Sequence, residues 1–488
     1  MQKILTVSCI MLMLFPLVGG TWTQEPVQGR TEHPDWPDGT FQGTWTTKTT
    51  NGSLQGTIEQ GKRNTLGTFT ATFSANTSCS GIFLGPILIG HWGENKSKIF
   101  LGMVLASATT FAGVLYDKSQ GMTRFQATYR ASFLPALTGT YAIGAESFQV
   151  NDTDRPEYFT PDPNDTRTFM VNLWYPLDHN ASGAQEYYMD PATFLWLKNQ
   201  SPIPLFTIPN TAYRFVHPHS QATQQIAPGL HPVLIFSPGY DGVYQIYTSL
   251  IEDLVSHGFV VAAINHPYVS GVTVFPDGHT VDIATPPTDP VEQEAFMNMS
   301  LRAIVEDAKT TLDVVTAMNE SDHAFAGRFD LGRVGMLGHS FGGGNTGVCL
   351  MEDSRFKAGL TLDGFFTTGF MNGTITQPLC MMVQEARFGN DTNTQYVWNH
   401  AVSDTFVIGI NGSTHYAFTD VGVLLSHLVP LIPPKILSFG TIPPKRMVNI
   451  TKTFTTAFFE VYLKGAPVET LLDLPAQFDE VQFEYKTG

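Results

Sequence analysis

The chain contains 488 residues, of which 42% are hydrophobic and 14% are charged, a composition typical of a folded protein with two or three domains. Its formal net charge of −16 disfavours binding to nucleic acid or to anionic lipid, because an acidic surface repels phosphate groups. The low charged fraction and ample apolar content also exclude an intrinsically disordered chain.

The N-terminus predicts a secreted protein. Residues 1–20 are typical of a signal peptide: Lys3 gives a positive start, residues 4–18 are mainly apolar, and Gly19 and Gly20 offer a cleavage zone. The apolar run is shorter than the about 20 residues that a membrane-spanning helix needs. Recurrent Asn-x-Ser/Thr sequons further predict an extracellular glycoprotein. These sequons begin at Asn51, Asn76, Asn95, Asn151, Asn164, Asn180, Asn199, Asn298, Asn319, Asn372, Asn390, Asn411 and Asn449.

Cysteines are few. Cleavage of the signal peptide leaves Cys79, Cys349 and Cys380, an odd number that requires at least one free or intermolecularly paired thiol. A disulfide between Cys349 and Cys380 stays open at this stage. The chain has no CxxC pair or zinc-type cluster, so we expect no metal and no cofactor. No sequence feature specifies an oligomeric state.

Residues 24–136 form a β-rich region with alternating runs separated by Gly and Asn, which favours an antiparallel sandwich or barrel. Two roles are open: a module that binds carbohydrate or a surface, and an accessory domain that packs on the catalytic domain. The expected strands cover residues 40–50, 54–59, 68–73, 82–89, 99–104 and 125–129.

Residues 137–488 alternate strands with helices, which predicts an α/β domain with a mostly parallel sheet. One long helix places residues 301, 304, 305, 308, 312 and 315 on one apolar face. Another is expected over residues 449–463, capped by Asn449 and Gly465. The expected strands cover residues 233–236, 259–264, 334–337, 358–362, 379–383 and 406–410.

The strand over residues 334–337 runs into Gly338-His339-Ser340-Phe341-Gly342, a GxSxG nucleophile elbow. The sharp strand-to-helix turn leaves no room for side chains two positions before and after the serine. The following helix points its N-terminus at the reaction centre, where negative charge develops. We therefore predict that Ser340 is a nucleophile.

A serine nucleophile needs a histidine base and an orienting carboxylate, which follow it in the order Ser, Asp or Glu, His in this fold. His415 lies beyond a late strand, where the base must be, whereas His400 precedes that strand and His427 is in an apolar helical stretch. Asp363 and Glu385 each follow a strand. We prefer Asp363, because a carboxylate beside an apolar strand needs a partner.

The oxyanion hole needs two backbone N–H groups. One is expected from Phe341, directly after the nucleophile. The other is expected from Tyr240, in the loop Ser237-Pro238-Gly239-Tyr240 that follows an earlier strand. An ordinary tight turn is the alternative for this loop.

Four segments carry a family resemblance: residues 256–263, residues 328–330 with 338–343, residues 353–363, and Gly412-Ser413-Thr414-His415. They resemble the plasma-type platelet-activating-factor acetylhydrolases. The resemblance implies an α/β-hydrolase fold, a Ser-Asp-His triad with Asp363 as the acid, no metal, and phospholipids with short or oxidised acyl chains as substrates. The oxyanion loop departs from the Ser-His-Gly-Leu of the plasma-type members.

The sequence therefore predicts a secreted serine ester hydrolase that acts on short-acyl phospholipids through an acyl-enzyme. Alternatives are a broad carboxylesterase, lipase or polyester hydrolase, a peptidase on the same fold, and an inactive binding protein. The apolar residues 421–432 are expected to form a core helix, an acyl-chain wall or a lip that contacts a lipid interface. A glycan on Asn411 would crowd His415, so we expect that sequon to be unused.

Overall fold

The computed structural model describes residues 134–488 except 180, 201–209, 211–212, 214–215, 322–323, 367–372 and 429–438, together with eight strands between residues 40 and 130. Those eight antiparallel strands close into a barrel, with β1 paired to both β2 and β8. Their bounds are β1 Thr40–Thr46, β2 Asn51–Gln60, β3 Gly67–Phe73, β4 Thr77–Leu84, β5 Ile87–Trp92, β6 Lys98–Val104, β7 Thr110–Asp117 and β8 Gly121–Arg130.

The barrel differs from the expected strands in two places. The single strand expected over residues 82–89 belongs to two strands, β4 and β5, and the sequence between them is the dipeptide Gly-Pro, a pattern that typically interrupts strands. The strand β7 was absent from the expectation; its sequence is a short apolar run without polar–apolar alternation. The remaining expected strands overlap observed ones.

The rest of the described chain builds one eleven-stranded sheet in the order β11-β12-β9-β10-β14-β13-β17-β18-β19-β20-β21. The strands from β14 to β20 are parallel, and antiparallel pairs flank them. The bounds are β9 Ile143–Pro156, β10 Thr166–Pro176, β11 Ala184–Gln185, β12 Gln221–Ala222, β13 His231–Ser237, β14 Val260–Asn265, β17 Phe329–His339, β18 Phe356–Leu362, β19 Leu379–Gln384, β20 Thr405–Ile410 and β21 Val481–Lys486. The hairpin β15 Val272–Val274 and β16 Thr280–Asp282 stands apart from this sheet.

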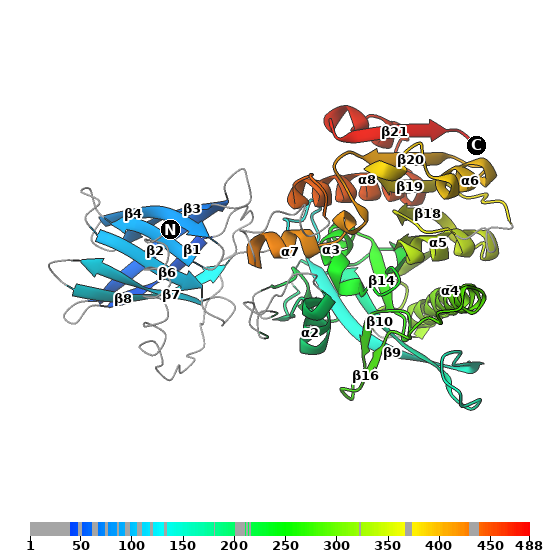
Figure 1. Ribbon diagram of the computed structural model, residues 1–488, viewed down its shortest axis with the longest axis horizontal. Helices are drawn as coiled ribbons and strands as arrows, with labels where there is room; N and C mark the ends of the chain where they lie inside the picture. The colour runs from blue at the N-terminus through cyan, green and yellow to red at the C-terminus, as the bar shows by residue number, and fades with distance from the viewer. Residues whose placement is uncertain are drawn as a thin grey trace. The chain divides into compact units, whose positions relative to one another are not determined.

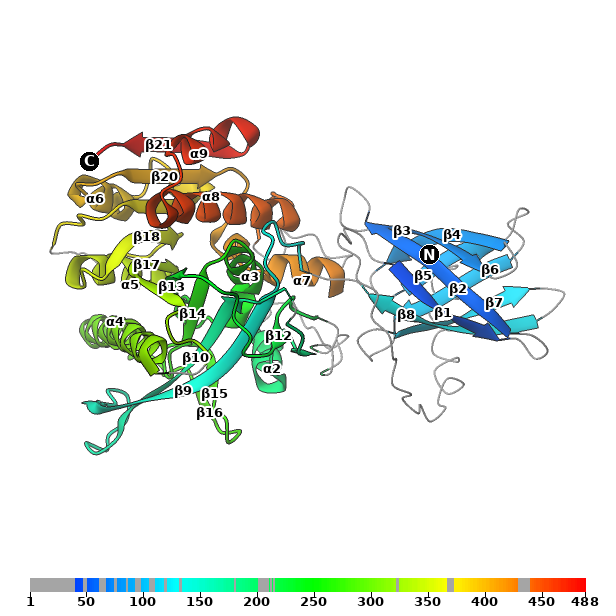
Figure 2. The same ribbon diagram turned by 180° about the vertical axis from the view of Figure 1, so that it is seen from behind.

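Helices cover both faces of the sheet, as Figures 1 and 2 show. One apolar core forms between the sheet and helices α3 and α8, and a second between the sheet and helices α4 and α5. All six predicted stripe residues of α4 are buried in the second core. The bounds are α2 Pro191–Gln200, η3 Tyr244–Tyr247, α3 Thr248–Ser256, α4 Pro290–Ser321, α5 Phe341–Glu352, η4 Glu385–Arg387, α6 Thr392–His400, η5 His415–Phe418, α7 Val421–Leu428, α8 Pro444–Lys464, α9 Glu469–Leu472 and η7 Leu474–Gln477.

Helix α8 corrects one expected cap. The helix begins at Pro444 with Pro443 as its N-cap, so Asn449 is an interior residue. Proline suits this position because the first turn of a helix needs no N–H donor from it. Gly465 ends the helix in the left-handed conformation with φ 74°, as predicted.

Cys349 and Cys380 are buried free thiols, so the disulfide between them is not formed. Burial raises the pKa of both. Cys79 lies in β4, and its side chain is outside the described residues. Within the described part of the chain, every helix is too short or too polar to cross a bilayer.

Candidate active site

Ser340 stands on a strained turn between β17 and α5. Its φ of 54° is positive, a conformation that costs a non-glycine residue energy. The turn is tight: a Cβ added to Gly338 would lie 2.2 Å from the Gly342 carbonyl oxygen, and one added to Gly342 would lie 2.1 Å from the Ser237 oxygen. Both flanking glycines are therefore required, as the elbow pattern predicts.

His415 connects Ser340 to a carboxylate. It begins η5 in the loop after β20, and its Nε2 lies 2.9 Å from Ser340 Oγ. Its Nδ1 lies 2.5 Å from Asp363 Oδ2. The Asp363 side chain is fully buried, while a third of the His415 side chain stays exposed. A ring nitrogen that can accept the proton of Ser340 Oγ and a carboxylate behind the ring are what a general base requires.

The surroundings of Asp363 favour its ionised form. The residue follows β18 with φ 46°, and its carboxylate accepts hydrogen bonds from the Gln384 N–H at 3.1 Å, the Gln384 side-chain amide at 2.8 Å and Arg387 at 3.1 Å. Burial alone would raise the pKa of Asp363. The hydrogen bond from His415 and the Arg387 guanidinium outweigh burial and lower this pKa below its ordinary value.

The alternatives to these two residues lie elsewhere. Glu385 accepts from the Gly412 N–H at 2.9 Å and so supports the loop that carries His415, without contacting the imidazole. His400 bonds through Nδ1 to the Tyr396 carbonyl at 2.8 Å. The His427 side chain is outside the described residues.

Tyr240 and Phe341 lie on two segments that meet beside Ser340. A Cβ on Gly239, the residue before Tyr240, would lie 3.1 Å from the Ser340 Cβ. The Tyr240 and Phe341 rings pack edge to face with centroids 5.9 Å apart. The Asp241 N–H donates to the Val269 carbonyl at 3.0 Å and fixes the loop from outside. Both proposed amide donors thus belong to backbone next to the serine.

A buried hydrogen-bond chain joins three of these segments and was not foreseen from the sequence. His339 Nε2 lies 3.0 Å from the His415 carbonyl, and His339 Nδ1 lies 2.9 Å from the Tyr247 hydroxyl. The carbonyl can only accept, so Nε2 carries the proton and Nδ1 accepts from Tyr247. The Gly239 backbone also bonds to the Tyr247 hydroxyl. One hydrogen-bond chain therefore connects the oxyanion loop, the nucleophile elbow and the loop that carries His415.

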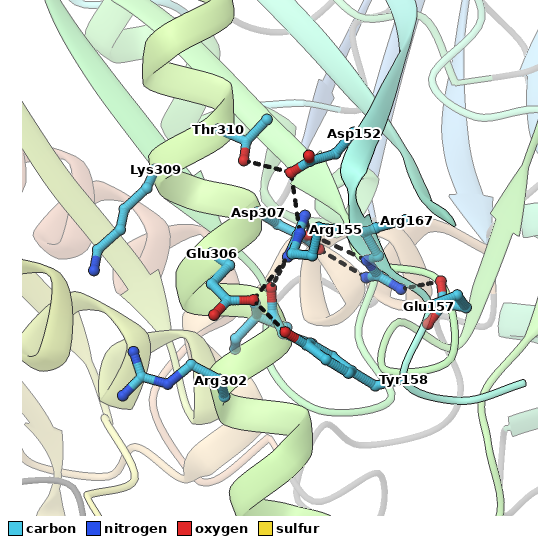
Figure 3. A network of polar contacts seen from close by, with 12 residues as sticks. Asp152, Arg155, Glu157, Tyr158, Arg167, Arg302, Glu306, Asp307, Lys309 and Thr310 are labelled. Carbon is cyan, nitrogen blue, oxygen red and sulfur yellow. Dashed lines mark hydrogen bonds and ion pairs between the residues drawn. The ribbon is translucent and has the colours of Figure 1, made fainter. Parts of the chain in front are cut away.

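A second support of the oxyanion loop begins at a buried ion network, which Figure 3 shows. Arg155 and Arg167 converge on Asp307 of α4, with N–O distances of 2.5 and 2.7 Å. The same carboxylate lies 2.8 Å from His266 Nδ1, and His266 Nε2 lies 2.9 Å from the Ser237 hydroxyl. Burial lowers the pKa of His266, which keeps the ring neutral. Ser237, at the start of the oxyanion loop, is thus tied to a buried ion network.

Ser340 and His415 open into a cavity of about 390 Å³. Its walls are mainly apolar side chains from α2, α7 and the residues before them, including Leu424 and Leu425. Leu424 is buried in a small core cluster and Leu425 packs against it, so this stretch is both a core helix and a pocket wall. The described residues contain no cluster of three or more metal-ligating side chains.

The fold and the site define the class of protein: an α/β-hydrolase that acts as a carboxylic ester hydrolase. The family is equally clear. Residues 126–287 and 288–466 match the model of platelet-activating factor acetylhydrolase, isoform II, and the chain belongs to this family.

Individual relatives agree with this assignment. The chain is 26% identical over 272 residues to a probable 1-alkyl-2-acetylglycerophosphocholine esterase of Arthroderma benhamiae, covering 52% of this chain and 66% of that protein. It is 25% identical over 363 residues to the platelet-activating factor acetylhydrolase of Bos taurus, covering 68% and 78%. Among solved structures, a ferulic acid esterase from Streptomyces cinnamoneus matches with a TM-score of 0.60 and 25% identity, over 71% of this chain and 98% of that one.

Proposed function

We propose that the chain cleaves carboxylic esters through a covalent acyl-enzyme, with Ser340 as nucleophile, His415 as general base and Asp363 as the orienting acid. The observation that supports this most directly is the unbroken contact from Asp363 Oδ2 through both His415 nitrogens to Ser340 Oγ, at 2.5 and 2.9 Å. A serine without a catalytic role would not need a strained backbone that directs its hydroxyl at His415 and Asp363.

In the acylation step, His415 Nε2 takes the Ser340 proton while Oγ bonds to the ester carbonyl carbon. The resulting oxyanion is stabilised by the Phe341 and Tyr240 N–H groups. Asp363, held ionised, stabilises the imidazolium. The tetrahedral intermediate then collapses, the carbon–oxygen bond to the alcohol breaks, and His415 returns the proton to the leaving oxygen.

In the deacylation step, water replaces the alcohol. His415 removes a proton from the water as its oxygen attacks the acyl carbon, and the second tetrahedral intermediate uses the same N–H groups. Collapse releases the carboxylic acid and returns the proton to Ser340 Oγ. The residues named here supply every proton transfer of this cycle.

For the substrate, we infer short-acyl phospholipids of the 1-alkyl-2-acetylglycerophosphocholine type. The names of the Arthroderma and bovine relatives support this choice. The apolar cavity beside Ser340 suits an acyl or alkyl chain. A broader carboxylesterase is the second candidate, favoured by Tyr240 in the oxyanion loop and by the similarity to a ferulic acid esterase.

We also propose that the protein is secreted and glycosylated. The signal-like residues 1–20 and the density of sequons support this. We expect the Asn411 sequon to carry no glycan, because Asn411 lies only four positions before His415. Expression with residues 1–20 intact, followed by glycopeptide mass spectrometry of the medium, tests secretion and glycosylation together. An occupied Asn411 would contradict the expectation that this sequon is unused.

The deciding experiment compares purified wild type with Ser340→Ala on p-nitrophenyl esters from acetate to decanoate, and on 1-alkyl-2-acetyl against 1-alkyl-2-palmitoyl glycerophosphocholine. We expect wild-type turnover to fall by about 10⁴-fold or more in the variant, as for loss of a triad serine. Preference for the acetyl phospholipid supports the narrow substrate class, and equal rates on all esters support the broad one. A folded wild type without turnover would favour an inactive binding protein or a peptidase.

A further inference from the structure

A second cavity lies next to the active-site pocket and contains none of the proposed catalytic residues. Its volume is about 550 Å³, within the range of ordinary ligand sites. Tyr188 and Met189 line both cavities, so they form a shared wall. The rest is built by the strands β9, β10 and β14, by η3 and the start of α3, by the residues before α2, by Pro218 and Ser220, and by the β15–β16 hairpin. We call it the second cleft.

Two polar atoms lining the second cleft have no protein partner. Asn172 is 4% exposed and Gln245 is 6% exposed, and neither Asn172 Nδ2 nor Gln245 Oε1 makes a hydrogen bond. The other end of the Asn172 amide, Oδ1, accepts from the Ser147 hydroxyl, which leaves Nδ2 as the donor without a partner. Buried amide atoms are almost always satisfied, so this donor and this acceptor indicate an absent partner. A hydroxyl group can accept from one and donate to the other.

Charge limits the class of that partner. The residues lining the second cleft include the carboxylates of Glu186 and Asp190 and no lysine or arginine, which disfavours an anion. Asp190 is engaged in capping α2, where it accepts from the Ala192 and Thr193 N–H groups at 2.9 Å. A bare cation would leave the Asn172 donor unsatisfied. A neutral ligand with hydroxyl groups meets both conditions.

The aromatic walls favour a ligand with one apolar face. Trp174 and Tyr244 meet edge to face in the second cleft with centroids 5.4 Å apart, and Tyr187 and Phe275 contribute further rings. The C–H face of a pyranose packs against aromatic rings, while its hydroxyls remain in reach of amides and carboxylates. Tyr187 is 57% exposed, so a ring is accessible at the mouth of the second cleft.

We propose that the second cleft binds a neutral polyhydroxylated ligand of the pyranose type, with one hydroxyl bridging Asn172 Nδ2 and Gln245 Oε1. The ligand is either a free sugar or the sugar part of an ester whose scissile bond lies at Ser340 across the shared wall. Sugar binding itself does not depend on the proposed hydrolysis. The competing explanation is ordered water at both amides.

The test is saturation-transfer NMR and calorimetry on the full chain carrying Ser340→Ala, with D-glucose, D-galactose and D-mannose as neutral probes. Glucuronate is the anionic comparison. We expect saturable binding of at least one neutral hexose, at least tenfold weaker binding of the anion, and at least tenfold loss in Gln245→Met and in Asn172→Leu. Gln149→Met, at an exposed glutamine of β9 that does not line the second cleft, is the matched control and should bind normally.

Circular dichroism and urea unfolding of the same variants verify that they fold. Absence of binding by all neutral probes, or equal binding by Gln245→Met, Asn172→Leu and the control, would overturn the proposal and leave water as the occupant. If a bound hexose inhibits the wild-type hydrolysis of a hexose 6-octanoate but not of p-nitrophenyl acetate, the second cleft serves the substrate. Binding without inhibition identifies a free sugar; both results support the site.

Discussion

Tyr247→Phe tests whether the hydrogen-bond chain between the three active-site segments matters for catalysis. The substitution keeps the ring, which is buried against Phe236 and His339, and removes only the hydroxyl. His339 Nδ1 loses its donor and the Gly239 backbone loses its partner. The ring volume is unchanged, so the effect comes from these two polar groups.

The structure sets the size of the effect. A buried polar group left unsatisfied costs about 1–3 kcal/mol, so the free energy of unfolding should fall by about 2–4 kcal/mol for two groups with partial relaxation. Loss of an oxyanion donor costs about 10²–10³ in kcat. The Tyr247 hydroxyl bonds to His339 and to the Gly239 backbone, and Phe keeps the ring that lines the active-site cavity. We therefore expect kcat to fall about tenfold, with KM changed by less than about twofold.

The matched control is Tyr175→Phe. Tyr175 is fully buried and donates one hydrogen bond to the Thr223 carbonyl at 2.6 Å, outside the active site. Urea unfolding and steady-state kinetics on p-nitrophenyl acetate measure both variants. Stability should fall in each, and kcat should fall only in Tyr247→Phe. Equal kcat in Tyr247→Phe and wild type, or an equal loss in the control, would refute a positioning role.

Three further predictions concern the acid, the ion network and the thiols. Asp363→Asn should lower kcat by about 10⁴-fold, while Glu385→Gln should keep kcat within about threefold of the wild type. A larger loss of kcat in Glu385→Gln than in Asp363→Asn would make Glu385 the acid. Arg167→Met should lower the free energy of unfolding in urea by about 3–5 kcal/mol, because buried Glu157 loses its ion-pair partner and Asp307 keeps only one of its two arginines; an unchanged midpoint would contradict this. Iodoacetamide should label Cys349 and Cys380 only after unfolding, since burial raises their pKa and blocks access, and peptide mass spectrometry reports any native labelling.

The α/β domain could be predicted because its signals are local. The apolar stripe from Leu301 to Val315 repeats at helical spacing within one element, and it is buried along its length. The elbow around Ser340 is equally local, since its glycines are fixed by the turn itself. Among the three histidines that follow Ser340 in the chain, the order of strands and loops in this fold then favoured His415, and His415 contacts Ser340 in the structure.

The remaining features depend on contacts between distant residues. Tyr247 lies 92 positions before His339, and nothing in the sequence around either residue indicates that they meet. The misplaced cap at Asn449 has a different cause: asparagine is a good cap in isolation, but Pro443-Pro444 had already begun the helix. The unpaired amides of Asn172 and Gln245 could be recognised only after all neighbouring partners were known.

His339 should also make the stability of the protein depend on pH. Burial, and next the charge of His415, lower the pKa of His339 to about 3, against about 6.5 in the unfolded chain. Between these values the unfolded state binds a proton that the folded state does not, so the free energy of unfolding falls as the pH falls below about 6.5. At 1.36 kcal/mol per pH unit below 6.5, His339 should lower the free energy of unfolding by about 2 kcal/mol between pH 7.5 and pH 5.

His339→Gln isolates this contribution, because glutamine can donate to the His415 carbonyl and accept from Tyr247 without titrating. Urea unfolding of both proteins at pH 7.5 and pH 5 gives the difference directly. Groups such as His266, whose pKa is also lowered by burial, act equally in both proteins and cancel. The wild type should lose about 2 kcal/mol more than the variant over this interval. An equal loss would mean that the folded protein protonates His339 by pH 5, and would contradict the prediction.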